Sequence, residues 1–265
     1  MPGSIEAELV FYQAPEDGTE PFNYVEEPPE GEPERNYGRD VRSVPIADIR
    51  GEESQYTLDQ DAFQILHEVP SATTDETFRD DEEIRRVYYP EVERLLLEQL
   101  PGAHTVVIFD HTIRISNPQA VRQPVHQVHA DQTQQSAAHR VKRHAEHLVN
   151  KGRYRIVNVW RPINGVVESS PLGFASARTT ADDDFVAIQH RYPTFNGEIM
   201  GVRYNPRTEW KFCSRIDSHE RILLKCFDTL PGVAARVAHT AFSDPRTRPT
   251  TKPRESIEVR ALVFG

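Results

Sequence analysis

The residues best suited to chemistry are a histidine and an aspartate that lie close together in the chain. In the stretch "PVHQVHADQT" (residues 124–133), His129 and Asp131 are two positions apart. Side chains at i and i+2 of an extended strand point to the same face, so these two could share one metal ion, whereas His126 points to the opposite face. An imidazole and a carboxylate are two of the three protein ligands of a facial metal site. H-x-D alone is frequent by chance, so a third ligand is needed.

A candidate third ligand, His239, lies 108 residues after Asp131. It belongs to the short apolar run "ARVAHTAF", which has the composition of a buried strand. A loop follows, and then the last strand-like run, "PRESIEVRALVF". In this run Arg254 and Ser256 share a face, with Arg254 fifteen residues beyond His239.

This order of parts (H-x-D, a distant His, then R-x-S on a final strand) resembles the Fe(II)- and 2-oxoglutarate-dependent oxygenases. The resemblance implies that His129, Asp131 and His239 hold Fe(II) on one face and leave three positions for a chelating keto acid and O₂. It also implies that Arg254 and Ser256 bind the far carboxylate of 2-oxoglutarate. The arginine supplies a planar charged fork, and the serine hydroxyl adds a hydrogen bond.

A closer resemblance covers most of the chain. The segments "NYVEEPPEGEPERNYG", "DIRGEESQYTLDQDAFQI", "VHQVHADQT", "YRIVNVWRPI", "VRYNP", "LLKCFD" and "PRESIEVRALVF" are similar, in this order, to the fungal hydroxylase/desaturase family. The aspergillic-acid hydroxylase and the gibberellin desaturase typify this family, and the bacterial cephamycin methoxylation component is related to it. The resemblance implies hydroxylation, desaturation or cyclisation of a small specialised metabolite through a ferryl oxidant, and a fungal origin.

The elements that must position these residues are mostly strands. Beyond residue 103, short β-branched or aromatic runs alternate with Pro, Asn, Gly and Asp turns: "TVVIFD", "TIRIS", "YRIVNVW", "FVAIQ", "IMGVRY", "EWKFCS", "ILLKCF" and "ESIEVRALVF". This pattern predicts a mainly β (α+β) protein of the jelly-roll or cupin-like kind. The oxygenases that this sequence resembles have a fold of this kind, the double-stranded β-helix.

Two helices are expected to brace the strands. Apolar residues recur every three or four positions from 80 to 100, and Pro101-Gly102 ends this helix. Pro90 should kink it or split it in two. A second helix is expected at 134–151, closed by Gly152, and its histidines His144 and His147 are assigned to a solvated face.

The negative charge of the chain is concentrated near its start. The net charge is −10; residues 1–60 hold 15 Asp/Glu and 4 Lys/Arg, and the remaining 205 hold 26 and 27. Residues 13–37 are rich in Pro and Glu, which favours an extended segment on the surface. We therefore expect an acidic N-terminal arm at 1–37, acting as a plain extension, a lid or an oligomer contact, and an oxygenase domain at 38–265.

The strand "YRIVNVWRPI" is a candidate wall of the active-site cavity. Ile156, Asn158 and Trp160 share one face, and Val157, Val159 and Arg161 share the other. The resemblance suggests that Asn158 hydrogen-bonds the keto acid or the substrate, and that Trp160 or Arg161 holds a substrate ring or carboxylate. Ordinary strand packing is the alternative. Arg203 and Tyr204 in "GVRYNP" are further candidate substrate-binding residues, with the same alternative.

Several other classes of protein are excluded by what the sequence lacks. Glycine-rich dinucleotide and phosphate loops, G-x-S-x-G and H-E-x-x-H are absent. Only two cysteines are present, Cys213 and Cys226, which we expect to be buried thiols in a reducing compartment. The sequence has no stripe of basic residues that would indicate nucleic-acid binding, and no apolar run long enough to indicate a membrane span. We expect a soluble cytoplasmic protein, with a homodimer left open.

Two other functions remain open at this point. One is a non-catalytic accessory subunit that works beside a partner, as in the cephamycin system. The other is a metal-independent binding protein, cyclase or isomerase that uses the same barrel cavity. The complete set of five residues, from His129 to Ser256, argues against the second. A methyltransferase is least favoured, because no glycine-rich loop follows a strand.

Overall fold

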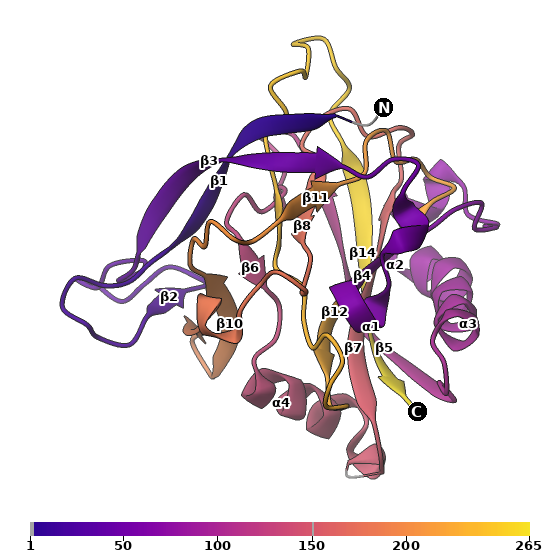
Figure 1. Cartoon of the computed structure of the whole chain (residues 1–265). Helices are drawn as coiled ribbons and strands as arrows, with labels where there is room; N and C mark the ends of the chain where they lie inside the picture. Colours follow the sequence, from indigo (N-terminus) through magenta and orange to yellow (C-terminus); the bar gives the residue numbers. More distant parts are fainter. Residues whose placement is uncertain (1–2, 150) are drawn as a thin grey trace.

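Two β-sheets form the body of the protein (Figure 1). The computed structural model describes residues 3–149 and 151–265. The larger sheet has nine strands, in the order β1 (Ser4–Gln13), β3 (Gly38–Asp48), β11 (Trp210–Phe212), β8 (Leu172–Ala175), β13 (His239–Ala241), β6 (His129–Ala130), β10 (Asn196–Val202), β9 (Phe185–Arg191) and β2 (Phe22–Tyr24). The smaller sheet has five, in the order β4 (Phe63–Leu66), β12 (Arg221–Asp228), β7 (Tyr154–Pro162), β14 (Glu255–Phe264) and β5 (Thr105–Ile115).

The five-stranded sheet is polar on its inner face near the start of β14 and apolar on both faces toward the end of β14. In β14, Ile257 and Val259 point outward into a cluster with α3 (Tyr89–Gln99), while Ser256 and Glu258 point inward. Since strand neighbours share a face, the inward row continues across β7 at Trp160, which pairs with Glu258. Aliphatic and aromatic residues of both sheets, among them Trp160, fill the adjoining interior. The sheets therefore enclose a cavity whose floor is polar.

The helices are short and cover the outside and one end of the sheets (Figure 1). Besides α3 and α4 (Gln134–His144), the short elements are η1 (Glu53–Gln55), α1 (Leu58–Asp61), η2 (Asp75–Arg79), α2 (Asp81–Glu83), η3 (Ile84–Tyr88), η4 (Glu146–Leu148) and η5 (Asp182–Asp184). None of the helices in the described residues reaches the length and hydrophobicity of a membrane span.

The first expected helix is continuous through Pro90, but its hydrogen-bond pattern changes just before this residue. The helical stretch begins at α2, passes through the π-helical turn η3 and continues as α3, with Pro90 in the first turn of α3. Proline has no N–H for the bond to the preceding turn, and it is tolerated at a helix start. Tyr88, Val92 and Leu96 then pack on the outer face of the five-stranded sheet. The bracing role is confirmed.

The second helix closes one end of the barrel and is shorter than expected. It ends at His144 and is followed by the turn η4, while Asn150, near the expected end at 151, lies outside the described residues. Val141 packs with Leu262 and Phe264 at the end of β14. The expected solvated face is partly covered, because His144 stacks on Phe109 at 5.3 Å between ring centroids.

The N-terminal segment differs from the expected arm. Residues 1–2 lie outside the described residues, and Ser4–Gln13 is a core strand whose Leu9 and Phe11 are buried. A parallel bridge between Val10 and Gln127 brings β1 back to the segment before β6, so the larger sheet curls on itself. The alternation in "SIEAELVFYQ" places every second residue in the core. A surface extension is therefore limited to 14–37, which carries only the short strand β2.

The two strands expected at 105–116 are one. β5 runs without a turn from Thr105 to Ile115, and its pairing with β14 shifts register between Arg260 and Ala261. This β-bulge inserts an extra residue next to Asp110, where the first of the two expected strands was to end. Asp110 thereby pairs with Arg260 instead of leaving the sheet.

Candidate metal centre

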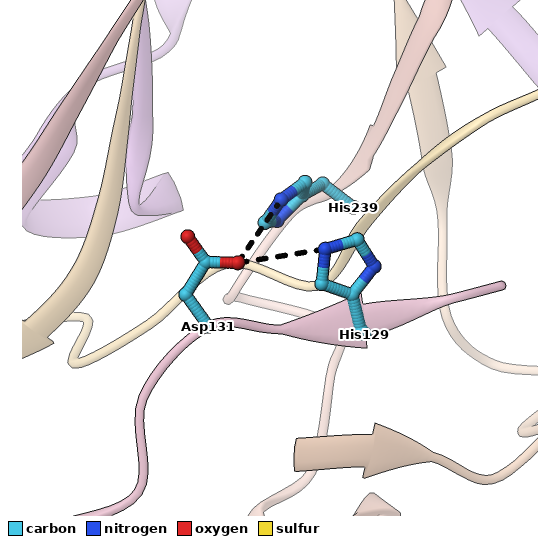
Figure 2. A group of neighbouring side chains, drawn as sticks. All are labelled: His129, Asp131 and His239. Carbon is cyan, nitrogen blue, oxygen red and sulfur yellow. Dashed lines mark ion pairs between the residues drawn. The ribbon is translucent and has the colours of Figure 1, made fainter. Parts of the chain in front are cut away.

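His129, Asp131 and His239 come together between the two sheets. Their ligand atoms lie within 4.8 Å of one another. The Asp131 Oδ1 atom is 3.4 Å from His129 Nε2 and 3.7 Å from His239 Nε2, and Figure 2 shows both rings facing this one carboxylate oxygen. His129 pairs directly with His239 across β6 and β13, which sets their rings 4.4 Å apart. The three side chains thus offer two nitrogens and one oxygen to a common point.

Hydrogen bonds to the backbone fix which nitrogen of each histidine is free. His129 Nδ1 lies 2.8 Å from the Gln127 carbonyl oxygen, and His239 Nδ1 lies 3.3 Å from that of Val237. A carbonyl only accepts, so each Nδ1 must carry the hydrogen and each Nε2 keeps its lone pair. Burial lowers the pKa of His239, and the nearby His129 adds to the shift. Both rings are therefore oriented with Nε2 available as a metal ligand.

The second oxygen of Asp131 is held by the protein. Asn158 Nδ2 donates a hydrogen bond of 2.7 Å to Asp131 Oδ2, and Arg260 Nε and Cys226 Sγ lie 3.7 and 3.8 Å from the same oxygen. Burial by itself would raise the pKa of Asp131, but the histidines and Arg260 hold it well below its usual range. Asp131 is therefore an anion with one oxygen bound and the other directed to the histidines.

An arginine lies at the other end of the cavity. Arg254 is 3% exposed, its guanidinium lies over Trp160 at 5.4 Å, and one nitrogen donates to the Ser170 carbonyl. Its Nε is buried and has no hydrogen-bond partner among the described residues. Burial lowers the pKa of Arg254 to about 9, with the charge of Arg114 as the next cause. A buried cation without a carboxylate is costly, which marks this end as a place for an anion.

The cavity also contains residues that the sequence analysis did not single out. Arg260 binds Asp110 at 2.9 Å and Glu258 at 2.7 Å, in addition to its approach to Asp131. The full lining is Thr112, Arg114, Val125, His129, Asp131, Trp160, Leu172, His239, Ala241, Arg254, Ser256, Glu258 and Arg260. The alternation that joins Arg254 to Ser256 continues to Glu258 and Arg260, so the sequence did contain this signal.

The five candidate substrate-binding residues separate into two groups. Asn158 and Trp160 point into the barrel, where Asn158 holds Asp131 and Trp160 lines the cavity. Arg161 points to the outer side, with its guanidinium over Phe78 and Tyr88. Because neighbouring strand residues face opposite ways, Arg161 cannot join Trp160 in the cavity.

Arg203 and Tyr204 also lie outside the cavity. Arg203 is exposed and donates to the Asp183 carbonyl at 2.9 Å. Tyr204 packs on Phe11, with ring centroids 5.3 Å apart, in the cluster around β1. The structure therefore brings neither to the three metal-ligand candidates.

Two further histidines and both cysteines are not among the three metal-ligand candidates. His126 lies outside the group of three, as the strand alternation predicts. His111 is a hydrogen-bonded strand histidine, with Nδ1 2.8 Å from the Tyr89 hydroxyl. Cys213 and Cys226 are buried free thiols, as expected.

Comparison with known proteins identifies the family. Residues 9–264 match the family described as an oxidoreductase/YMDC permease-like domain. The chain is 34% identical over 286 residues to the alpha-ketoglutarate-dependent dioxygenase phiK of a fungal species, covering 99% of each chain. It is 31% identical over 301 residues to the hydroxylase/desaturase poxK of Penicillium oxalicum, covering 99% of this chain and 92% of that protein.

A solved structure extends the likeness to the fold. The iron and alpha-ketoglutarate-dependent endoperoxidase NvfI superposes with a TM-score of 0.91 at 29% identity, covering 99% of this chain and 98% of that one. The jelly-roll fold predicted from the strand pattern, and the double-stranded β-helix implied by the resemblance, are thereby confirmed. The chain belongs to this oxidoreductase family and, within it, to the hydroxylase/desaturase group of iron- and 2-oxoglutarate-dependent dioxygenases.

Proposed function

We propose that this protein is an Fe(II)- and 2-oxoglutarate-dependent oxygenase that acts on a small organic molecule. Fe(II) binds to His129, Asp131 and His239, and 2-oxoglutarate binds with its far carboxylate at Arg254 and Ser256. The observation that carries the proposal is the convergence of two imidazole Nε2 atoms and one carboxylate oxygen within 4.8 Å. Two histidines and one carboxylate are the ligand set of non-haem Fe(II) oxygenases.

The donor atoms fit this metal and this co-substrate. Both histidines already have the tautomer that leaves Nε2 free, so little reorganisation is needed. At the other end of the cavity, the buried Arg254 Nε lacks a partner among the described residues and can donate to a carboxylate. A molecule with a keto acid at one end and a carboxylate at the other complements both ends.

The protein's own residues position the reactants. Iron with 2-oxoglutarate supplies the activation of O₂ that allows an unreactive C–H bond to be oxidised. Asn158 and Arg260 hold Asp131 so that one oxygen faces the metal position. Trp160 and Leu172 form apolar wall beside the site and exclude water from it.

The names of the relatives support the class of reaction. phiK is named an alpha-ketoglutarate-dependent dioxygenase, NvfI an iron and alpha-ketoglutarate-dependent endoperoxidase, and poxK a hydroxylase/desaturase. We propose hydroxylation, desaturation or cyclisation of a small specialised metabolite for this chain. A cytoplasmic location and a homodimer stay predictions of the sequence.

An anaerobic titration with Fe(II) and 2-oxoglutarate tests the proposal. A keto acid that chelates Fe(II) produces a metal-to-ligand charge-transfer band in the visible range. The wild-type protein should show the band, His239→Ala should lose it, and Arg254→Ala should require much more 2-oxoglutarate to reach it. Circular dichroism spectra that match the wild type would show that both variants fold.

A folded wild-type protein without the band would refute the oxygenase proposal. The accessory subunit and the metal-independent cyclase or isomerase would then be the functions to test. Activity that appears only when this protein is co-expressed with the product of a neighbouring gene would indicate that it is an accessory subunit. Binding of a small molecule in the presence of a chelator would indicate the metal-independent protein.

A further inference from the structure

A second arginine, Arg114, lies at the Arg254 end of the cavity. Arg114 is directly opposite Ser256 in the pairing of β5 with β14, and Arg254 is two residues before Ser256. All three residues line the same cavity. Paired residues of adjacent strands point to the same face, so Arg114 and Ser256 project inward side by side. Ser256 therefore has two arginines beside it, Arg114 on the neighbouring strand β5 and Arg254 two residues earlier in its own segment.

Arg114 has no carboxylate of its own. Its one side-chain hydrogen bond within the described residues is from Nη1 to the Gln123 carbonyl, at 2.9 Å, and no acidic oxygen of those residues lies within 4.0 Å of it. The nearest acid along the same face is Glu258, which is bound by Arg260 at 2.7 Å. The other donors of the half-buried Arg114 guanidinium are therefore free to bind a ligand.

Two arginines beside one another are unfavourable unless an anion lies between them. Burial lowers the pKa of Arg114, and the charge of Arg114 is itself a cause of the lowered pKa of Arg254. Like charges in a cavity of low dielectric repel more strongly than in water. A carboxylate placed over Ser256 would accept hydrogen bonds from both guanidinium groups and remove this repulsion.

We propose that Arg114 binds the far carboxylate of 2-oxoglutarate together with Arg254, as the second half of a two-arginine clamp. This inference rests on the proposed function, since it concerns the same co-substrate. The clamp makes the site selective for keto acids that end in a carboxylate. Removing either arginine weakens binding only of those keto acids.

Two keto acids and three variants test the clamp. The anaerobic Fe(II) titration is repeated with 2-oxoglutarate and with 2-oxopentanoate, which has the same chain length but no far carboxylate. Arg114→Gln removes the charge, and Arg114→Lys restores the charge without the planar fork. Arg122→Gln is the matched control, because Arg122 is an exposed arginine in the following loop and does not line the cavity.

A selective loss is expected. Arg114→Gln should weaken 2-oxoglutarate binding about tenfold or more, the usual size of a lost charge-assisted hydrogen bond. The Kd for 2-oxopentanoate should stay within about twofold of the wild-type value, because this keto acid has no far carboxylate for Arg114 to bind. Arg114→Lys should recover part of the loss. Arg122→Gln, which removes a charge near Arg114 but no donor in the cavity, should weaken 2-oxoglutarate binding far less than Arg114→Gln does and leave 2-oxopentanoate binding unchanged.

Other outcomes would overturn the clamp. Equal weakening of both keto acids would mean that Arg114 only supports the shape of the cavity. Unchanged 2-oxoglutarate binding in Arg114→Gln would mean that Arg114 serves another ligand, such as a carboxylate on the oxidised substrate. A wild-type protein that shows no charge-transfer band with 2-oxoglutarate would instead refute the oxygenase proposal itself, before Arg114 is considered.

Discussion

Asn158 is the residue whose replacement should reveal how the metal site is held. It is fully buried and donates a 2.7 Å hydrogen bond to Asp131 Oδ2, the oxygen turned away from the histidines. Because Asp131 is an anion, this is a charge-assisted bond, worth about 1.5–3 kcal/mol. Arg260, at 3.7 Å, is too far from the same oxygen to replace it with a good hydrogen bond.

Asn158→Ala should therefore weaken Fe(II) binding without weakening 2-oxoglutarate binding. A loss of about 1.5–3 kcal/mol corresponds to roughly a 10- to 100-fold higher Kd for Fe(II), which is the usual effect of removing a residue that orients a metal ligand. The affinity for 2-oxoglutarate, measured at saturating Fe(II), should be unchanged, because Asn158 is not among the residues that line the Arg254 end.

Anaerobic Fe(II) titrations of the variant and of a matched control measure this effect. Asn205→Ala is the control, since Asn205 Nδ2 also donates to a carboxylate, that of Asp184 at 2.9 Å, but lies outside the cavity. The control should bind Fe(II) as the wild type does. A folded Asn158→Ala protein with wild-type Fe(II) affinity would show that Asp131 is oriented by other contacts and would refute this reasoning.

Three further predictions concern stability. Lys225→Met removes one of the two cations that bind the Asp228 carboxylate. The free energy of unfolding, measured in urea, should fall by less than the ~3–5 kcal/mol lost when a buried charge has no partner, because Arg153 still binds Asp228 at 2.6 Å. Burial would raise the pKa of Asp228, but hydrogen bonds from Arg153 and Lys225 lower this pKa overall. The ionised Asp228 therefore stabilises the fold fully above the unfolded-state pKa of about 3.9, and this stabilisation is lost as the pH falls below that value. Urea unfolding of wild type at a series of acidic pH values should show this loss, and a flat profile would contradict it. Arg161→Ala should lower the Tm by about 2–4 °C, the shift expected for a loss of ~1 kcal/mol in a protein of this size. Fe(II) and 2-oxoglutarate binding should not change, because Arg161 bonds to Thr73 at 2.7 Å outside the cavity; weaker ligand binding would restore it as a site residue.

The position of the metal-ligand candidates could be predicted because strand geometry leaves little choice. His129 begins the two-residue strand β6 and Asp131 follows directly after it, and the spacing of two still brings both side chains to one point. His239 begins β13, although residues 234–238 of its apolar run belong to no strand. What the spacing could not show is that His129 and His239 are direct partners across β6 and β13. That pairing depends on contacts between segments 110 residues apart, and no local pattern encodes it.

The side of a strand that faces the cavity could not be predicted in the same way. Alternation in "YRIVNVWRPI" correctly separates Asn158 and Trp160 from Arg161, but both faces of β7 are buried. One face contacts the helical brace and the other contacts the barrel interior. Arg161, on the helix side, donates hydrogen bonds to Ser71, Thr73 and the Ser218 carbonyl. Because these partners are distant in the chain, the sequence does not distinguish Arg161 from an arginine that faces the cavity.

The N-terminal strand and the continuity of β5 could not be predicted from composition and local pattern. The many acids of residues 1–60 hid the alternation that places Leu9 and Phe11 in the core. The runs "TVVIFD" and "TIRIS" predicted two strands, although a β-bulge keeps β5 continuous between them. Dividing this strand hid the fact that Asp110, Thr112 and Arg114 lie along one polar row, which is how Arg114 escaped notice.

The charges of the cavity explain why iron and 2-oxoglutarate suit the same site. Three arginines and three acids lie in or beside it: Arg114, Arg254, Arg260, Asp110, Asp131 and Glu258. Their formal charges cancel, but they are not evenly placed. Arg260 is surrounded by all three acids, while Arg114 and Arg254 stand at the far end without one. A divalent cation beside Asp131 and a dianion that reaches Arg254 keep the sum at zero and reduce the repulsion at each end. Buried charges are tolerated when each is paired, so neither ligand alone satisfies the cavity as well as the two together.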